Sequence, residues 1–391
     1  MNHSLDNNTL TIMLEGRIDT SNSTEVEAQI RELLSGETYE KFELDASNLE
    51  YISSSGLRIL MKLRKENDSL TINNVSNDVY EIFETTGFTE ILTINKAYRT
   101  ISIDNLEVIG AGQTGTVYRI NPEQIVKVFK GLSDTSIIFK EKNISQNVFL
   151  AGVPTAISYD VVKVGDSYGV IYELLNANDL SFFVNQDIDN CDEYIIKFAN
   201  FLKACHKIEL DESKFTQKID EFRNVLPYLE GVVCNKEELA KLCAIVDNVP
   251  KSKTFVHGDA HIGNVMVQDD EFMFIDMTTA GIAHPIYDLG SMYLLFHLFA
   301  KSDARRTSTE VTKNMSAEQC ERIWQLFLKT YLGTDDEAKF KKAEAQIGAF
   351  VCTRTLLAVL AFPDMFDKDT LAFLKNSAIS EYDNGLEPLC F

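Results

Sequence analysis

The sequence predicts a small α/β domain followed by a two-lobed α+β unit, in which a β-rich lobe precedes a helical lobe. Three observations lead to this prediction. Strand and helix patterns alternate at the start of the chain, strand-like segments continue to about Leu175, and helix-periodic sequence then dominates, apart from one short β-like stretch. We therefore expect domains at residues 1–98 and 103–391, with the lobes of the second domain at about 103–175 and 176–391.

The first domain is predicted to alternate strands and helices. Apolar residues at every second position indicate a strand, and apolar residues three and four positions apart indicate a helix. The apolar positions that mark these elements are, in order, Leu10, Ile12 and Leu14 (strand), Val26, Ile30 and Leu33 (helix), Phe42 and Leu44 (strand), Leu57, Leu60 and Met61 (helix), Leu70 and Ile72 (strand), and Val79, Ile82 and Phe83 (helix). This order predicts helices packed on a sheet.

A glycine-rich segment opens the second domain. Gly110, Gly112, Gly115 and Val117 form a G-x-G-x-x-G-x-V pattern, whose glycines let backbone N–H groups approach phosphates closely. A dinucleotide-binding loop would lead directly into a helix, but this sequence continues with β-branched residues, a turn and another strand. The pattern therefore predicts a loop that caps a β-hairpin. A glycine-rich surface turn is the alternative.

The strand after this hairpin contains a lysine between apolar residues. Lys127 points to the face opposite its neighbours, because side chains alternate along a strand. A lysine in this position is suited to bind nucleotide phosphates, whereas a lone charge on an edge strand is the alternative. Glu141 lies in a helix-compatible segment and is the best partner to hold Lys127 in place, ahead of Glu123 and Glu173.

The strongest pattern runs from a histidine pair to an aspartate at the end of a short strand. The segment His-Gly-Asp259-Ala-His-Ile-Gly-Asn264 is followed by an apolar strand that ends in Asp276. Phosphoryl transfer needs a carboxylate to receive the hydroxyl proton, and separate oxygen ligands to hold Mg²⁺ on the nucleotide phosphates. Asp259, Asn264 and Asp276 supply that set. Polar residues that merely cap strands are the alternative.

This H-G-D-x-H-x-x-N segment with its following Ile-Asp strand end resembles the aminoglycoside phosphotransferase and choline kinase group of the protein-kinase-like superfamily. The resemblance covers roughly residues 105–300. It implies a kinase-like fold that binds ATP and Mg²⁺, with Mn²⁺ as an alternative ion. It also implies that Asp259 is the catalytic base, that Asn264 and Asp276 are the metal ligands, and that Lys127 contacts the α- and β-phosphates.

Further residues are expected to support this site. His257 and His261 are expected to shape the loop rather than bind metal, because they lack a third nitrogen or sulfur ligand. Asp288 resembles the family's buried acid that anchors the backbone of the catalytic loop, and a solvated acid at a helix start is the alternative. The adenine is expected to lie against backbone groups near Glu173 and Leu175, where the lobes join.

The acceptor is predicted to be a hydroxyl of a small molecule. Only eleven residues separate Asp276 from Asp288, so the long segment on which protein kinases bind peptides is missing. The complete glycine pattern keeps a Ser/Thr protein kinase in a partner-switching circuit as an alternative, and a non-catalytic nucleotide-binding scaffold is a second one. Five acids favour a cationic, aminoglycoside- or choline-like acceptor, or else form a solvated face: Asp179, Asp187, Asp189, Asp192 and Glu193.

The first domain resembles the STAS module of anti-sigma-factor antagonists. The resemblance rests on Gly16–Asp19 and on a serine-rich turn that ends at Gly56 before an amphipathic helix. It implies a regulatory or docking domain with a protein partner, in which the phosphorylated serine is Ser54, two places before the glycine. The acid that usually precedes this serine is replaced by Ser53. A simple helix N-cap is the alternative for Ser54.

Composition excludes several other classes. The 391 residues include 59 acidic and 37 basic ones, and the net charge of −22 disfavours nucleic acids and anionic membranes as partners. The seven cysteines are widely spaced, without a C-x-x-C pair, which argues for reduced thiols. No apolar run approaches the ~20 residues that a membrane span needs, and the N-terminus has no export signal. We therefore expect a cytoplasmic protein.

Overall fold

The chain folds into two compact units, Met1–Ser102 and Ile103–Phe391. Two positions of the glycine-rich segment, Gln113 and Thr114, lie outside the described residues. This computed structural model describes residues 1–112, 115–130, 135–363, 366–389 and 391.

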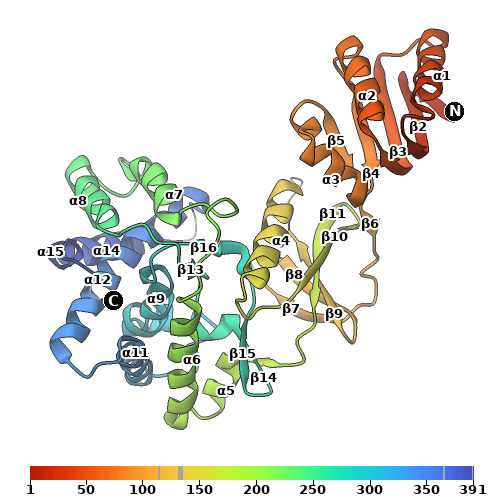
Figure 1. Ribbon diagram of the computed structural model, residues 1–391. Helices are drawn as coiled ribbons and strands as arrows, with labels where there is room; N and C mark the ends of the chain where they lie inside the picture. The colour runs from red at the N-terminus through yellow and green to blue at the C-terminus, as the bar shows by residue number, and fades with distance from the viewer. Residues whose placement is uncertain (113–114, 131–134, 364–365, 390) are drawn as a thin grey trace. The chain divides into compact units, whose positions relative to one another are not determined.

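The first unit contains a five-stranded sheet in the order β1-β2-β3-β4-β5, with helices packed against it (Figure 1). The β1–β2 pair is antiparallel and the other pairs are parallel. Alternate strand residues such as Leu10, Ile12 and Leu44 are fully buried, as the sequence pattern predicts. The elements are β1 (His3–Asp6), β2 (Thr9–Ile18), α1 (Ser23–Gly36), β3 (Lys41–Ile52), α2 (Ser54–Glu66), β4 (Thr71–Val75), α3 (Asn77–Thr85), β5 (Thr93–Lys96) and β6 (Arg99–Thr100).

The second unit begins with a β-rich lobe, whose antiparallel strands follow the order β10-β11-β9-β8-β7. The glycine-rich segment joins β7 to β8 in a hairpin, as predicted. Lys127 lies in the strand β9, between partner residues on β8 and β11. The elements are β7 (Val108–Ala111), β8 (Gly115–Asn121), β9 (Gln124–Phe129), α4 (Thr135–Leu150), β10 (Ser158–Val164) and β11 (Ser167–Glu173).

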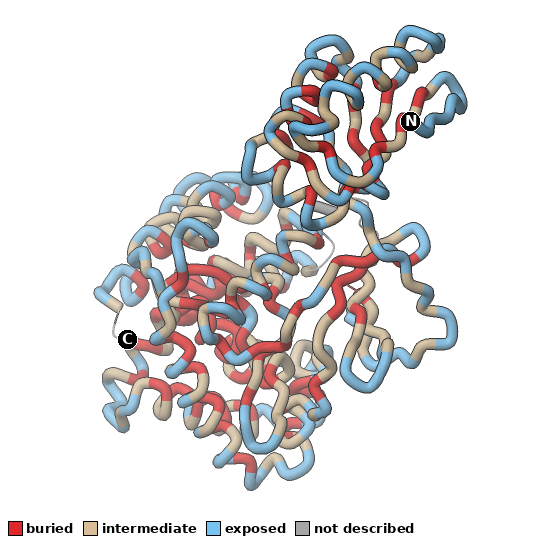
Figure 2. The backbone as a smooth tube through the Cα atoms, turned by 45° about the vertical axis from the view of Figure 1, so that its right-hand side comes forward, coloured by how far each residue is buried: buried red, intermediate tan, exposed pale blue. Residues whose placement is uncertain are grey.

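The helical lobe follows, and its helices enclose a large apolar core (Figures 1 and 2). Two short antiparallel pairs, β13–β16 and β14–β15, lie within it. The elements are β12 (Asn178–Asp179), α5 (Leu180–Gln186), α6 (Asp192–Cys205), α7 (Lys218–Val225), α8 (Lys236–Asp247), β13 (Phe255–Val256), β14 (Val265–Gln268), β15 (Glu271–Phe274), β16 (Gly281–Ile282), α9 (Ile286–Tyr293), α10 (Asp303–Arg306), α11 (Ala317–Leu332), α12 (Glu337–Leu356), α13 (Ala358–Ala361), α14 (Lys368–Ser380) and α15 (Tyr382–Gly385).

The fold class that the sequence predicts is therefore confirmed, since an α/β unit precedes a β-rich lobe and a helical lobe. One helical stretch in the described part of the chain, Glu337–Ala361, is long and apolar enough to cross a membrane by length and composition alone. The sequence expectation overlooked this stretch. Because 61% of its most apolar 18-residue window is buried, it also has the character of a core helix in a globular protein.

Candidate active site

The loop that carries Asp259 follows the strand β13 and is held through its backbone N–H groups. Gly258 has a φ of +83°, and a Cβ atom added there would lie 2.4 Å from the carbonyl oxygen of Thr279. Only glycine fits this turn without strain. The Oδ2 and Oδ1 atoms of Asp288 accept hydrogen bonds from the backbone N–H groups of His257 and Gly258, at 2.8 and 2.6 Å. The loop is thus tied to α9.

Asp288 is fully buried in the first turn of α9, so it is not a solvated acid. Its Oδ2 atom also accepts a hydrogen bond from Nε2 of His206, at 3.0 Å, and Nδ1 of His206 lies 2.8 Å from the hydroxyl of Tyr331. Burial opposes ionisation of the Asp288 carboxyl, but the hydrogen bonds from His206 and the backbone of His257 hold its pKa below the ordinary value. Asp288 therefore anchors the loop as a carboxylate.

The two histidines of the motif make hydrogen bonds to different parts of the loop and its surroundings. Burial lowers the pKa of His257, which keeps the ring neutral. Its Nε2–H donates to the carbonyl of Ile275 at 2.9 Å, and its Nδ1 accepts from the N–H of Asp259 at 3.2 Å. Nδ1 of His261 accepts from the N–H of Gly263 at 3.0 Å. Both rings therefore shape the loop, and His257 joins it to the strand that precedes Asp276.

The Asp259 carboxylate faces solvent, with 53% of its side chain exposed. Three side chains surround it: Nδ2 of Asn264 at 3.3 Å, Nε2 of His261 at 3.6 Å and the hydroxyl of Ser291 at 3.3 Å. Partial burial opposes ionisation, but the nearby His261 ring and the positive charge of Arg354 outweigh it and hold the pKa of Asp259 well below its ordinary value. Asp259 is therefore ionised at neutral pH.

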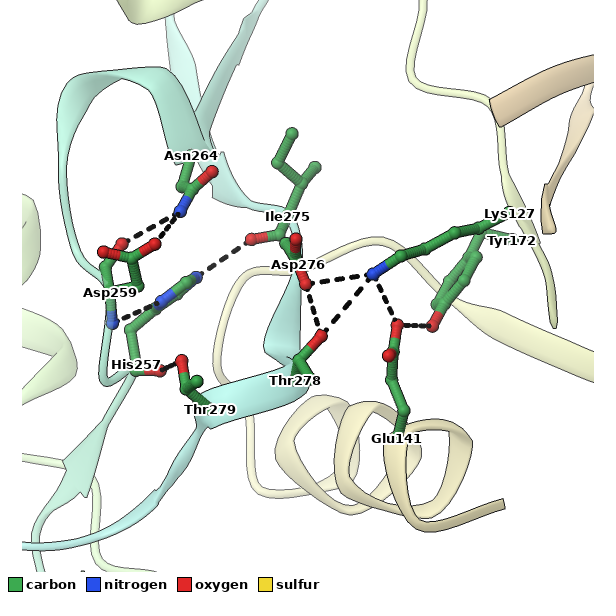
Figure 3. Close-up of polar contacts among 10 residues, drawn as sticks. All are labelled: Lys127, Glu141, Tyr172, His257, Asp259, Asn264, Ile275, Asp276, Thr278 and Thr279. Atoms are coloured by element: carbon green, nitrogen blue, oxygen red, sulfur yellow. Dashed lines mark hydrogen bonds and ion pairs between the residues drawn. The ribbon is translucent and has the colours of Figure 1, made fainter. Parts of the chain in front are cut away.

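Asn264 and Asp276 offer oxygen atoms next to this loop. Nδ2 of Asn264 donates to the backbone carbonyl of Asp259 at 3.0 Å, which leaves its Oδ1 atom as an acceptor. The backbone carbonyl of Asn264 accepts from the N–H of Ile275 at 3.0 Å, so the two segments lie side by side. Asp276 follows directly, and Figure 3 shows it between Lys127 and the Asp259 loop. The five-residue interval and the strand end thus bring the predicted set together.

Lys127 connects the two lobes at this point. Its Nζ atom lies 2.9 Å from Oε1 of Glu141 and 3.1 Å from Oδ1 of Asp276 (Figure 3). Burial opposes the charge on Lys127, but the two carboxylates outweigh it and raise its pKa. The hydroxyl of Tyr172 donates to Glu141 at 3.0 Å, and Thr278 donates to Asp276 at 2.5 Å. The predicted Lys127–Glu141 pair is therefore present, and Asp276 is a third member.

A cavity of about 540 Å³ lies between the β-rich lobe and the start of the helical lobe. A Cβ atom on Gly115 would lie 2.5 Å from the carbonyl of Val128, whereas Gly112 has open space. The cavity also contains Asp276. It is lined by every residue that the sequence assigns to nucleotide binding: Gly110, Gly112, Gly115, Val117, Lys127, Glu141, Glu173 and Leu175.

The donor set around Asp276 suits a hard divalent cation. Carboxylate and amide oxygens are the ligands that Mg²⁺ and Mn²⁺ prefer. Elsewhere in the described chain, His297, Glu321 and Glu344 could also hold a metal ion. There, however, Nζ of Lys301 lies 2.8 Å from Nε2 of His297 and already supplies a positive charge. The oxygen set at Asn264 and Asp276 is the better candidate.

The acids at the start of the helical lobe are engaged in local contacts. Asp179 caps α5, and Asp187 accepts hydrogen bonds from the side chain of Asn190. The other three contact side chains of the same lobe: Asp189 with Gln319, Asp192 with Arg322 and Glu193 with Lys197. These contacts are the ones that the structural alternative predicts, and a cationic acceptor stays a prediction.

In the first unit, Ser54 is the exposed first residue of α2 and not its N-cap. The N-cap is Ser53, whose side chain accepts from the N–H of Ser55 at 3.2 Å. The alternative that Ser54 caps the helix is therefore wrong. An exposed hydroxyl in the first turn is open to modification, and a phosphate there would meet the positive end of the helix dipole.

Sequence reasoning missed several contacts of the site. His206, at the end of α6, contacts Asp288, and Arg354, near the end of α12, contacts Gly258 of the loop, both from far away in the sequence. His206 follows an apolar helix face that ends in Leu202 and Cys205, which is a weak signal for a buried histidine. Arg354 has no local signal. Thr278 was missed because its contact depends on the left-handed turn at Asp276, where φ is +60°.

Comparison with protein families gives two matches. The family described as "Phosphotransferase enzyme family" matches residues 105–310, and the family described as "Mlab, STAS domain" matches residues 1–93. Among curated proteins, none matches this sequence.

Solved structures that resemble this chain share little sequence identity with it and superpose on it with TM-scores below 0.5. ADP-bound aminoglycoside phosphotransferase APH(2'')-Ib is 17% identical over 79% of this chain and 97% of its own, with a TM-score of 0.45. Choline kinase from Cryptosporidium parvum Iowa II is 14% identical over 73% of this chain and 91% of its own, with a TM-score of 0.44. Aminoglycoside phosphotransferase APH(3'')-Id from Streptomyces rimosus is 15% identical over 72% and 92%, with a TM-score of 0.39.

Proposed function

This chain belongs to the phosphotransferase enzyme family, and we propose that it transfers the γ-phosphoryl group of ATP to a hydroxyl of a small molecule. One observation carries the proposal. The Lys127–Glu141 pair meets Asp276 at one end of a cavity, and an ionised Asp259 lies on the adjoining loop. This arrangement is suited to bind the nucleotide phosphates, to hold a metal ion and to accept the proton of the acceptor hydroxyl.

The nucleotide would occupy the 540 Å³ cavity. The N–H of Glu173 already donates to Ile157 and that of Leu174 donates to Glu123, both through backbone carbonyls. The N–H of Leu175 has no partner among the residues that the structure describes, so it is available to the adenine. The triphosphate would then extend under the glycine-rich hairpin toward Lys127.

Asn264 and Asp276 would hold Mg²⁺. A cation held there would neutralise charge on the nucleotide phosphates. Before nucleotide binds, Lys127 makes the nearest charge contact to Asp276, at 3.1 Å. Oε2 of Glu141 is buried without a hydrogen-bond partner in the described chain, so it offers Lys127 a second acceptor on Glu141 when Lys127 turns to the phosphates.

Asp259 would orient the acceptor hydroxyl. Because its pKa lies well below the ordinary value, the carboxylate is always free to accept a hydrogen bond, but it is a weak base. A loose transition state, in which the bond to the leaving oxygen is largely broken, needs little proton transfer at the start. Asp259 therefore receives the proton late, as the new P–O bond forms.

The segment between Asp276 and Asp288 supports a small-molecule acceptor. This segment contains a short helical turn, Met277–Thr279, and the two-residue strand β16, which pairs with β13. A peptide platform of the protein-kinase kind would need a longer segment. A protein kinase that acts on a STAS serine is the second candidate, and the matched STAS domain is the observation that favours it.

We assign the first unit a regulatory or docking role in the cytoplasm, with exposed Ser54 as the phosphorylation site. A phosphate there would add about −1.5 to −2 charges at the N-terminus of α2. Phosphosite mapping of the protein purified from its own cells tests this assignment. Phosphate at Ser54 is expected, and phosphorylation confined to other residues would contradict it.

Radiolabelled ATP separates the proposals. Full-length protein, Mg²⁺ and γ-labelled ATP are incubated with either a metabolite extract or the protein fraction of the same cells, beside the matched variant Asp259→Asn. We expect label in a small molecule with wild type only. Label confined to protein would favour the second candidate. Absence of label in both fractions, with no release of phosphate, would contradict the proposed function.

A further inference from the structure

We propose that Arg354 is a positioning residue for the reaction, which fixes the peptide unit that carries Asp259. The inference rests on the proposed function. Arg354 lies near the end of α12, beyond the 105–310 segment that matches the family. Within the described chain its hydrogen bonds go to Gly258 of the loop and to Tyr287 of α9, so its effect on turnover would pass through the loop that carries Asp259.

The guanidinium of Arg354 donates to two backbone carbonyls. Nη1 donates to the carbonyl of Tyr287 at 2.8 Å, and Nη2 donates to the carbonyl of Gly258. The guanidinium also lies 5.8 Å from the centre of the Tyr287 ring. A single half-buried side chain therefore joins the start of α9 to the residue immediately before Asp259.

These contacts complete a clamp on the loop. The peptide unit between Gly258 and Asp259 has its carbonyl bound by Arg354 and its N–H bound by Nδ1 of His257. The preceding N–H, that of Gly258, is bound by Asp288. With both ends of the peptide held, the Cα–Cβ direction of Asp259 is fixed relative to α9, which orients the carboxylate before any acceptor arrives.

Close packing of two helices lets Arg354 reach the loop. A Cβ atom on Gly290 of α9 would lie 2.6 Å from Cγ2 of Val351, and one on Gly348 of α12 would lie 2.6 Å from the hydroxyl of Tyr293. The two glycines thus face side chains of the opposite helix. A larger residue at Gly290 would clash with both Cγ2 and Cβ of Val351, and we expect it to push α12, and Arg354 with it, away from the loop.

The geometry requires arginine and not merely a positive charge. Two carbonyls from different segments are bridged by the planar fork of one guanidinium, whereas an ammonium group is a compact point charge on a flexible stem. Arg354→Lys is therefore expected to hold one carbonyl at a time. Arg354→Met keeps the apolar stem and removes both hydrogen bonds.

The test compares wild type, Arg354→Lys and Arg354→Met in the full-length chain. As a matched control, Arg305→Met removes an arginine that donates to Thr370 and stacks on Phe373, away from the loop. MgATP is the probe, and kcat and KM for phosphate release are measured. We expect Arg354→Met to lower kcat by roughly 10²-fold, because misplacement of about 1 Å has that effect, with KM nearly unchanged. Arg354→Lys should recover part of the loss.

Hydrogen exchange of residues 257–264 gives a second readout that does not depend on turnover. We expect faster exchange in Arg354→Met than in wild type, and no change in Arg305→Met. Wild-type kcat and wild-type exchange in Arg354→Met would overturn the inference. If wild type itself neither turns over nor binds MgATP, the proposed function fails, while faster exchange in Arg354→Met would still support the clamp. If Arg354→Met does not fold, Arg354→Lys decides by the same two measurements.

Discussion

At Asp276 the backbone adopts a left-handed conformation, with φ of +60°. Aspartate tolerates this region better than most residues, although the strain costs of order 1 kcal/mol. The turn points the carboxylate back toward Lys127, and Thr278 donates to the same oxygen that Lys127 contacts. The other carboxylate oxygen is therefore the better placed of the two to receive a cation.

Replacing Asp276 by alanine should weaken Mg²⁺-dependent binding of ATP. The change removes one of two proposed cation ligands and leaves the cavity otherwise intact. A loss of about tenfold or more in affinity is expected, which corresponds to roughly 1.4 kcal/mol. Calorimetric titration with and without Mg²⁺ measures it, and Ser54→Ala serves as the unaffected control. Equal affinities in wild type and Asp276→Ala would rule out the metal role.

His284 should make the stability of the second unit sensitive to pH. Burial lowers its pKa to about 4, and the nearby charge of His206 adds to the effect. The unfolded chain therefore binds a proton between about pH 6.5 and 4 that the folded chain does not, so stability is complete above pH 6.5 and falls with acidification. The expected loss is up to about 1.4 kcal/mol per pH unit.

Urea unfolding of wild type and His284→Gln at pH 7.5 and 5.0 checks this expectation. The variant should lose less stability than wild type over the same interval. His3→Gln, at a partly exposed position, is the matched control. An identical loss in wild type and His284→Gln would show that other groups carry the acid sensitivity.

Local sequence predicted the residues of the site whose roles depend on short spacing. Asp259, Asn264 and Asp276 come together because one loop and one strand end hold them. His206 and Arg354 could not be predicted, since His206 contacts Asp288, 82 residues away, and Arg354 contacts Gly258, 96 residues away. Such contacts depend on helix packing, which spacing in the sequence does not encode.

At the scale of elements, the packing of α9 against α12 affects the site, because α12 carries Arg354, which contacts the loop. Gly290→Ala would place a methyl group 2.6 Å from Cγ2 of Val351, in a core with no spare room. We expect a loss of about 1–3 kcal/mol in stability, as is usual for overpacked cores, together with slower phosphate release. The double variant Gly290→Ala with Val351→Ala should recover part of both.

Thermal unfolding and phosphate release of the single and double variants test this coupling. Gly36→Ala is a suitable control, because a Cβ atom there meets nothing within 4 Å. If Gly290→Ala unfolds and turns over like wild type, then α9 and α12 are not tightly packed in solution.

The sequence predicted the central elements of the first unit but not its edge strands. β1 is exposed along its whole length and has no apolar alternation, so no hydrophobic period marks it. It forms because Asn7 and Asn8 adopt positive φ values of 46° and 61°, which suit a tight hairpin turn. β5 is short, and it is defined by its pairing with β4 rather than by its composition.

At the scale of the whole molecule, each unit has its own apolar core. The cavity and the residues proposed for catalysis all lie after residue 102. Deletion of residues 1–102 should therefore leave a folded unit with the kcat and KM of the full chain within about twofold, as expected for an autonomous domain. Circular dichroism and the MgATP assay check both parts. An unfolded truncation would mean that the two units stabilise each other.

The most direct test of the account is the turnover and nucleotide affinity of Asp259→Asn. Asparagine keeps the size of the side chain and removes the proton acceptor, while Lys127 and Asp276 stay in place. The account predicts that phosphoryl transfer from MgATP falls by roughly 10²–10⁴-fold, with the Kd for MgATP nearly unchanged. Transfer at the wild-type rate in Asp259→Asn would contradict it.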